Sequence, residues 1–207
     1  EETGYFLNLV VKTKKPVVLT AAMRPSTALS ADGPLNFYNA VAVAANKDAA
    51  GRGVLVVVND WIHGASSLTK ASTTAVQTFL SPLRGLIGVV AYGEAEFYRG
   101  PVGRNTLDSE FSLDGVTALP RVDIVMAHAN MDGAMIDGAA AAGAKGIVIA
   151  GVGNGNMTEA GLKALAAQAK KGIVCVRSSR VVTGRVARNV EVDDDKLGLI
   201  ASDDLNP

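Results

Sequence analysis

The chain has 207 residues, of which 48% are hydrophobic and only 5% aromatic, so its core must be aliphatic and rich in alanine. Twenty basic residues balance twenty acidic ones, and this neutrality gives no electrostatic support for a nucleic-acid or anionic-membrane partner. No apolar run approaches the roughly 18 residues that a membrane-spanning helix needs, and the single cysteine excludes an internal disulfide bond.

The first distinctive feature is a long loop that follows a predicted strand. Residues 16–20 form an apolar run that begins with proline, which predicts a short buried strand. Asp32-Gly33-Pro34 then opens a helical pattern, because proline suits the first turn of a helix. The loop between them, residues 21–33, lies at the expected carboxyl end of the strand, where open α/β sheets bind ligands. We therefore predict a functional loop.

A helix and a strand are predicted next. The helix covers residues 35–46, and the strand covers residues 53–59, where an uninterrupted β-branched run is typical of a parallel strand buried on both faces. Further on, apolar runs on either side of Tyr92-Gly93-Glu94 predict a β-hairpin. The apolar residues that we expect on one face of the helix, toward the core, are Leu35, Tyr38, Val41 and Ala45.

The second half of the chain repeats the strand–helix rhythm after an irregular segment. Residues 99–120 lose periodicity and are read as an interdomain linker. The fold class predicted is α/β, with two doubly wound, mostly parallel-sheet domains at 1–98 and 121–207. The elements expected in the second domain are strands at 122–126, 146–150 and 172–176 and helices at 132–142 and 158–170.

The residue types that carry chemistry give weak signals on their own. The turn at 151–156 fails the dinucleotide-binding pattern, because Asn156 occupies the place of its last glycine. Asn154 and Asn156 could hold a substrate through their side-chain amides. They could also be present only because asparagine tolerates left-handed backbone angles, and the residue types alone favour this second interpretation. His63 and His128 lack carboxylates at ligand spacing, so no metal site is expected.

Two further side chains have ordinary interpretations when taken alone. Lys70 follows an alternating polar segment and by composition is a surface lysine. Cys175 lies inside a strand pattern and is expected to be a buried thiol rather than a nucleophile.

Several motifs, taken together and in order, resemble those of bacterial type II L-asparaginases and the related glutaminase-asparaginases, and the resemblance covers the whole chain. The motifs are Ala22-Met23-Arg24-Pro25-Ser26-Thr27, Ser30-Ala31-Asp32-Gly33-Pro34, Arg52-Gly53-Val54-Leu55-Val56-Val57, Asn59-Asp60, Thr69-Lys70, Gly151-Val152-Gly153-Asn154-Gly155-Asn156, Val176-Arg177-Ser178-Ser179-Arg180 and Leu205-Asn206-Pro207.

The resemblance implies a reaction and assigns residues to it. It implies hydrolysis of L-asparagine to L-aspartate and ammonia through a threonine acyl-enzyme, without metal or cofactor. Lys70 matches the family's catalytic lysine, which we expect to be buried beside a hydroxyl–carboxylate pair and to face the loop at 21–33. Ala22 and Met23 match backbone beside the leaving amide. Asn156 and Glu191 match substrate-binding residues that the neighbouring subunit donates, and a carboxylate suits the substrate's α-ammonium.

The resemblance also implies partners and a location. A homodimer with shared active sites is expected, usually paired into a homotetramer, in the periplasm, with the cytoplasm as the alternative. The family's nucleophilic threonine and its threonine–aspartate pair have no counterpart here and are expected before Glu1. The resemblance also implies that residues 1–98 are the later part of a larger N-terminal domain and that residues 121–207 are a smaller C-terminal domain without its final helix. We therefore expect this chain to be the middle of a longer enzyme and to be inactive alone.

Other interpretations stay open at this point. A glutaminase-asparaginase would have broader specificity and accept L-glutamine, although Glu191 predicts a preference for asparagine. A two-domain binding protein for small solutes has the same composition and coarse topology. The third interpretation is a catalytically inactive fragment that serves only in assembly.

Overall fold

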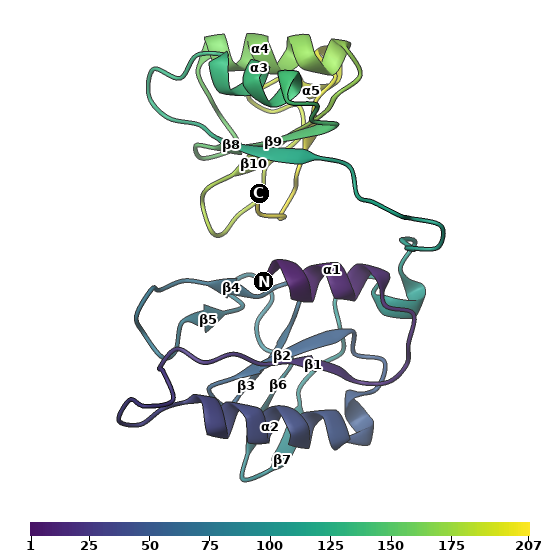
Figure 1. The fold of residues 1–207 in the computed structure, drawn as a ribbon, viewed down its shortest axis with the longest axis vertical. Helices are drawn as coiled ribbons and strands as arrows, with labels where there is room; N and C mark the ends of the chain where they lie inside the picture. Colours follow the sequence, from purple (N-terminus) through teal and green to yellow (C-terminus); the bar gives the residue numbers. More distant parts are fainter. The chain divides into compact units, whose positions relative to one another are not determined.

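The computed structural model describes residues 1–207, which divide into two compact units, residues 1–115 and 116–207 (Figure 1). Both units combine strands with helices, which confirms the α/β class. The division falls inside the segment 99–120, where we propose the interdomain linker. No helix combines the length and the apolar character that crossing a membrane requires.

A five-stranded sheet in the order β1-β2-β3-β6-β7 forms the centre of the first unit. Helices α1 (Glu2–Val10) and α2 (Gly33–Ala45) cover its opposite faces (Figure 1). The strands are β1 (Val17–Leu19), β2 (Val54–Val58), β3 (Trp61–Gly64), β6 (Gly88–Ala91) and β7 (Glu94–Phe97). The smaller elements are η1 (Lys47–Ala49), η2 (Thr106–Asp108) and a separate antiparallel pair, β4 (Thr69–Lys70) with β5 (Phe79–Leu80).

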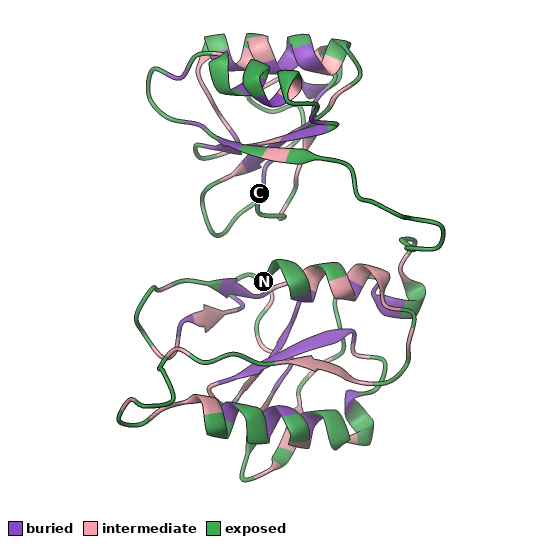
Figure 2. Ribbon diagram, viewed as in Figure 1, coloured by how far each residue is buried: buried purple, intermediate pink, exposed green.

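The pairing within this sheet is mixed. Strand β2 is buried along its whole length (Figure 2) and runs parallel to β1, as its sequence predicts. On its other side β2 pairs antiparallel with β3, because Asn59 and Asp60 both adopt positive φ and turn the chain back at once. The hairpin predicted around Tyr92 and Gly93 is confirmed as β6 and β7, with positive φ at both residues.

Helix α2 exists as predicted, but the prediction of its core-facing side is wrong. Leu35, Tyr38 and Val41 are exposed, whereas the buried side chains of the helix are Asn36, Asn39, Ala40 and Val43. The two asparagines can be buried because each is hydrogen-bonded: Asn36 to the loops that follow β1 and β2, and Asn39 to the Asp60 carboxylate at 2.8 Å. Assigning polar residues to the surface therefore predicts the wrong buried face for α2.

The second unit contains a four-stranded sheet in the order β11-β10-β9-β8, in which all neighbours are parallel. Helices α3 and α4 lie on one face of it (Figure 1). The elements are β8 (Val122–Met126), α3 (Ala134–Ala141), β9 (Gly146–Gly151), α4 (Glu159–Lys170), β10 (Val174–Ser179), α5 (Asp194–Leu197) and β11 (Ile200–Ala201). Every element predicted between 122 and 176 is present, whereas α5 and β11 were not predicted.

The core of this unit is aliphatic. Ile147 and Ile149 of β9 pack with Leu165 of α4 and with Cys175, and all four are fully buried. Helix α4 begins at a side-chain cap, since Thr158 Oγ1 accepts a hydrogen bond from the Gly161 N–H at 3.1 Å. Burial raises the pKa of the Cys175 thiol to about 11, so this residue is an inert part of the core, as predicted.

Candidate functional site

The loop after β1 is held in shape by one carboxylate. Asp32, at the start of α2, accepts hydrogen bonds from the backbone N–H of Met23 at 2.8 Å and of Arg24 at 2.8 Å. The Arg24 guanidinium in turn donates to the carbonyl of Ser30 at 2.8 Å, which closes the loop on itself. The backbone around Ala22 and Met23 is thereby fixed at the carboxyl end of β1.

Asn36 connects this loop to the next strand end. Its side-chain N–H donates to the Ala21 carbonyl at 2.9 Å and to Asp32 at 3.2 Å, and its oxygen accepts from the Asn59 N–H at 2.8 Å. Burial raises the pKa of the Asp32 carboxyl, but the N–H donors around it outweigh this effect and hold the pKa below its usual value. The carboxylate is therefore ionised near neutral pH and stabilises the loop.

Lys70 does not have the environment that the resemblance implies. Its side chain is exposed, and its ammonium lies 5.8 Å from the centre of the Phe79 ring. The expected burial is therefore not observed within residues 1–207. The reason is local: Thr69 faces the core and is buried, so the next residue of the short strand β4 points outward. The backbone N–H of Lys70 donates to the carboxylate of Glu1.

The glycine-rich turn after β9 brings two of the predicted site residues together. The amide of Asn156 donates a hydrogen bond to the carboxylate of Glu191, which lies 35 residues further along the chain. Gly153 and Gly155 adopt the positive φ angles of this turn. The interpretation that the asparagines occupy left-handed positions is therefore wrong. Their side chains instead make hydrogen bonds to other parts of the chain.

A buried ion pair lies behind this turn. Arg177 of β10 and Asp194 of α5 are both fully buried, and their side chains approach to 2.6 Å. Burial raises the pKa of the Asp194 carboxyl, but hydrogen bonds from Arg177 and from the Asn189 N–H reverse the direction, so the pKa lies below its usual value. The pair therefore remains charged in the folded protein.

The histidines are not arranged as metal ligands. His63 on β3 is fully buried, with Nδ1 2.8 Å from the Ser81 hydroxyl and no partner on Nε2. Burial lowers the pKa of His63 to about 4. No group of three or more His, Cys, Asp or Glu side chains is positioned to hold a metal ion.

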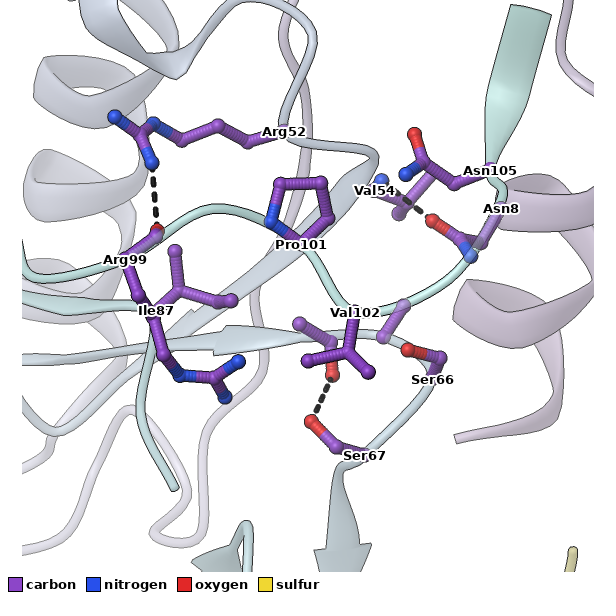
Figure 3. A pocket seen from close by; sticks show the side chains of 12 residues that line it. Asn8, Arg52, Val54, Ser66, Ser67, Ile87, Arg99, Pro101, Val102 and Asn105 are labelled. Carbon is purple, nitrogen blue, oxygen red and sulfur yellow. Dashed lines mark hydrogen bonds between the residues drawn. The ribbon is translucent and has the colours of Figure 1, made fainter. Parts of the chain in front are cut away.

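Two cavities lie in the structure, and neither is lined by a residue that the resemblance assigns to the site. The first has a volume of about 10 Å³, room for about one water molecule, and Pro101 and Val102 lie beside it (Figure 3). Asn8 accepts from the Val54 N–H at 2.9 Å and Arg52 donates to the Arg99 carbonyl, so the cavity lies where residues 99–105 pack against the rest of the first unit.

The second cavity lies in the other unit and has a volume of about 250 Å³, below the usual range of ligand pockets. Neither Asn156 nor Glu191 lines it. It is formed by the turns after β9 and β10 together with residues 203–206.

Sequence reasoning named Asn156, Glu191, Ala22 and Met23 but missed the side chains that hold them. Asp32 had a signal, because an acid directly before Gly-Pro at a helix start can accept from nearby backbone N–H groups. For Arg177 the signal was a charged residue that continues an apolar strand, since such a charge must be paired if the strand is interior.

Comparison with known proteins gives matches along nearly the whole chain. Residues 1–103 match the family model described as "Asparaginase, N-terminal", and residues 121–207 match "Glutaminase/Asparaginase C-terminal domain". The two matches occur in chain order, one in each half of the chain.

Curated relatives extend over all of this chain. A protein of Haemophilus influenzae named "Probable L-asparaginase periplasmic" is 51% identical over 207 residues, which is 100% of this chain and 59% of that protein. "L-asparaginase 2" of Escherichia coli is 48% identical, over 100% of this chain and 60% of its own length. "Glutaminase-asparaginase" of Pseudomonas fluorescens is 45% identical, over 100% and 57%.

The chain therefore spans about three fifths of the length of the relatives that it matches. The two family models account for most of its residues, and the relatives carry asparaginase names. This chain belongs to the asparaginase family.

Proposed function

We propose that the protein containing this chain is an amidohydrolase that converts L-asparagine to L-aspartate and ammonia. A threonine outside residues 1–207 attacks the side-chain amide carbon, ammonia leaves, and water hydrolyses the resulting acyl-enzyme. The chain contributes a catalytic lysine, the loop beside the leaving amide, and two residues that bind the substrate.

The observation that best supports this proposal is the contact between Asn156 and Glu191. Both were assigned to substrate binding by their motifs, although they lie 35 residues apart and on different loops. A carboxylate beside an amide suits an amino-acid substrate, because the carboxylate binds the α-ammonium while the amide supplies directed hydrogen bonds.

Ala22, Met23 and Lys70 have the remaining roles. The loop that holds Ala22 and Met23 is fixed by Asp32, so its backbone is preorganised beside the leaving amide. Lys70 is proposed to lie between a threonine hydroxyl and a carboxylate from outside this chain, where its ammonium stabilises a developing alkoxide or exchanges a proton. The exposed position of Lys70 leaves room for such partners.

The assembly, cofactor use and location are part of the same proposal. Asn156 and Glu191 would act on the neighbouring subunit's substrate, which requires a homodimer and is consistent with a homotetramer. No metal or cofactor takes part. The protein would be periplasmic, as the Haemophilus influenzae relative is named, with the cytoplasm as the alternative.

Substrate preference is proposed to favour asparagine over glutamine, on the basis of Glu191. A glutaminase-asparaginase with broader specificity is the second candidate, because the Pseudomonas fluorescens relative carries that name.

The test measures ammonia release by the purified full-length protein from L-asparagine and from L-glutamine. We expect a higher kcat/KM with asparagine, and a fall in turnover of at least about a hundredfold in Lys70→Ala. Lys47→Ala, another exposed lysine of the first unit, is the control and should keep wild-type turnover. Near-normal turnover in Lys70→Ala would show that Lys70 is not a catalytic residue. Binding of asparagine without ammonia release would favour a solute-binding protein, and a higher kcat/KM with glutamine would favour the second candidate.

A further inference from the structure

We propose that Arg177 and Asp194 are positioning residues that hold Asn156 and Glu191 together for substrate binding. The inference rests on the proposed function, because it gives the buried ion pair a role in that site. Arg177 acts through backbone: its hydrogen bonds end on Asp194 and on carbonyls of two loops, the turn at 151–156 and the turn at 187–191.

The Arg177 guanidinium uses all five of its N–H donors. Two go to the Asp194 carboxylate, from Nε at 2.6 Å and from Nη2 at 2.8 Å, in the paired geometry that suits arginine and not lysine. The other three go to the carbonyls of Asn154 at 2.9 Å, Gly155 at 3.3 Å and Ala187 at 3.3 Å. One buried cation thus fixes both loops at once.

Asp194 extends the same network toward Glu191. Its second oxygen also accepts from the backbone N–H of Asn189 at 2.9 Å, two residues before Glu191. Independently, the side-chain oxygen of Asn154 accepts from the Ala187 N–H at 2.7 Å and ties the two turns directly. The loop that carries Asn156 and the loop that carries Glu191 are therefore joined through Arg177, Asp194 and Asn154.

The turn is shaped to approach the guanidinium. Gly155 has a φ of +75°, and a Cβ at this position would lie 3.1 Å from Arg177 Nη1 and 2.9 Å from Val186 Cγ1. A side chain here would push the turn away from the arginine.

Stability alone does not explain such an arrangement. Buried ion pairs can often be replaced by apolar side chains of similar size without loss of stability. The three hydrogen bonds from Arg177 to loop carbonyls instead fix the position of each loop relative to the other.

The experiment uses the full-length protein and measures KM and kcat for L-asparagine together with the Tm. In Arg177→Lys the charge remains but the planar fork is lost, so we expect KM to rise about tenfold or more with a small change in kcat. Asn154→Ala removes the direct tie between the turns without touching a charge and should also raise KM. Asn154→Asp keeps an acceptor oxygen at this position and should have the KM of the wild type. Arg185→Lys, in the exposed ion pair with Asp203, is the control and should leave KM unchanged.

The outcomes separate this inference from the proposed function. A wild-type protein that releases no ammonia from asparagine overturns the proposed function and the inference with it. Ammonia release by the wild type with an unchanged KM in Asn154→Ala overturns the inference alone, whatever happens to the Tm. If Arg177→Lys does not fold, the two Asn154 variants give the answer.

Discussion

His63 should make the first unit sensitive to mild acid. Its ring is fully buried on β3, Nδ1 contacts Ser81, and Nε2 has no hydrogen-bond partner that could stabilise the charged ring. Burial lowers the pKa of His63 from 6.5 to about 4, so the folded protein resists protonation where the unfolded chain does not.

The direction of the effect follows from proton linkage. At pH 7 the ring is mostly neutral in both states, so His63 contributes little pH dependence there. As the pH falls below 6.5, the unfolded chain binds a proton that the folded protein excludes, and the free energy of unfolding decreases. The shift from 6.5 to about 4 corresponds to a loss of about 2 kcal/mol by pH 5 and about 3 kcal/mol by pH 4.

The assay is urea unfolding of the full-length protein at pH 7 and at pH 5, at one protein concentration because subunit association affects stability. The fluorescence of Trp61 reports on this region, since its ring centre lies 6.0 Å from that of His63. The comparison variant is His63→Asn, whose amide can keep the contact with Ser81 but does not titrate. The variant should be less stable at both pH values and should lose about 2 kcal/mol less than the wild type between them.

The comparison of two proteins removes the contribution of other titrating groups. Asp32 and Asp194, whose pKa values are lowered in the fold, also reduce stability in acid, but they do so equally in both proteins. Equal losses in wild type and His63→Asn would refute the burial of a neutral histidine at this position.

Three further predictions test other parts of the structure. Cys175 should resist thiol reagents in the native protein and react only on unfolding, because it is buried with a raised pKa; rapid labelling of the folded protein would contradict this. Asp32→Ala should lower the free energy of unfolding by about 2 kcal/mol and raise KM for asparagine, because the N–H groups of Met23 and Arg24 lose a charged acceptor; a wild-type urea midpoint and KM would argue against that role. Limited proteolysis should cut first within residues 110–120, because all of them are exposed. Mass spectrometry of the fragments locates the cuts, and early cuts elsewhere would contradict the proposed position of the linker.

The regular elements of this protein could be predicted because apolar runs and turn residues specify them locally. The run at 54–58 and the pair Tyr92-Gly93 gave a buried strand and a hairpin, and both are present. The strand β3 was missed because the turn at Asn59 and Asp60 is only two residues long, and a strand end gives the same pattern.

The packing of buried polar groups could not be predicted in the same way. Asn36 and Asn39 reverse the buried face of α2, and their partners come from loops that are distant in sequence. Arg177 and Asp194 are 17 residues apart, and nothing local says that they pair. Burial of Lys70 was expected from the resemblance alone, and in the structure its side chain is exposed.

The position of the Lys70 ammonium tests the central claim most directly. A crystal structure of the full-length protein with L-aspartate bound would show it. We predict Nζ within about 3.2 Å of both a hydroxyl and a carboxylate, shielded from solvent and facing the loop at 21–33 near the ligand. An amine that stays in solvent, with the ligand bound elsewhere, would contradict the assignment of this chain to an asparagine-hydrolysing site.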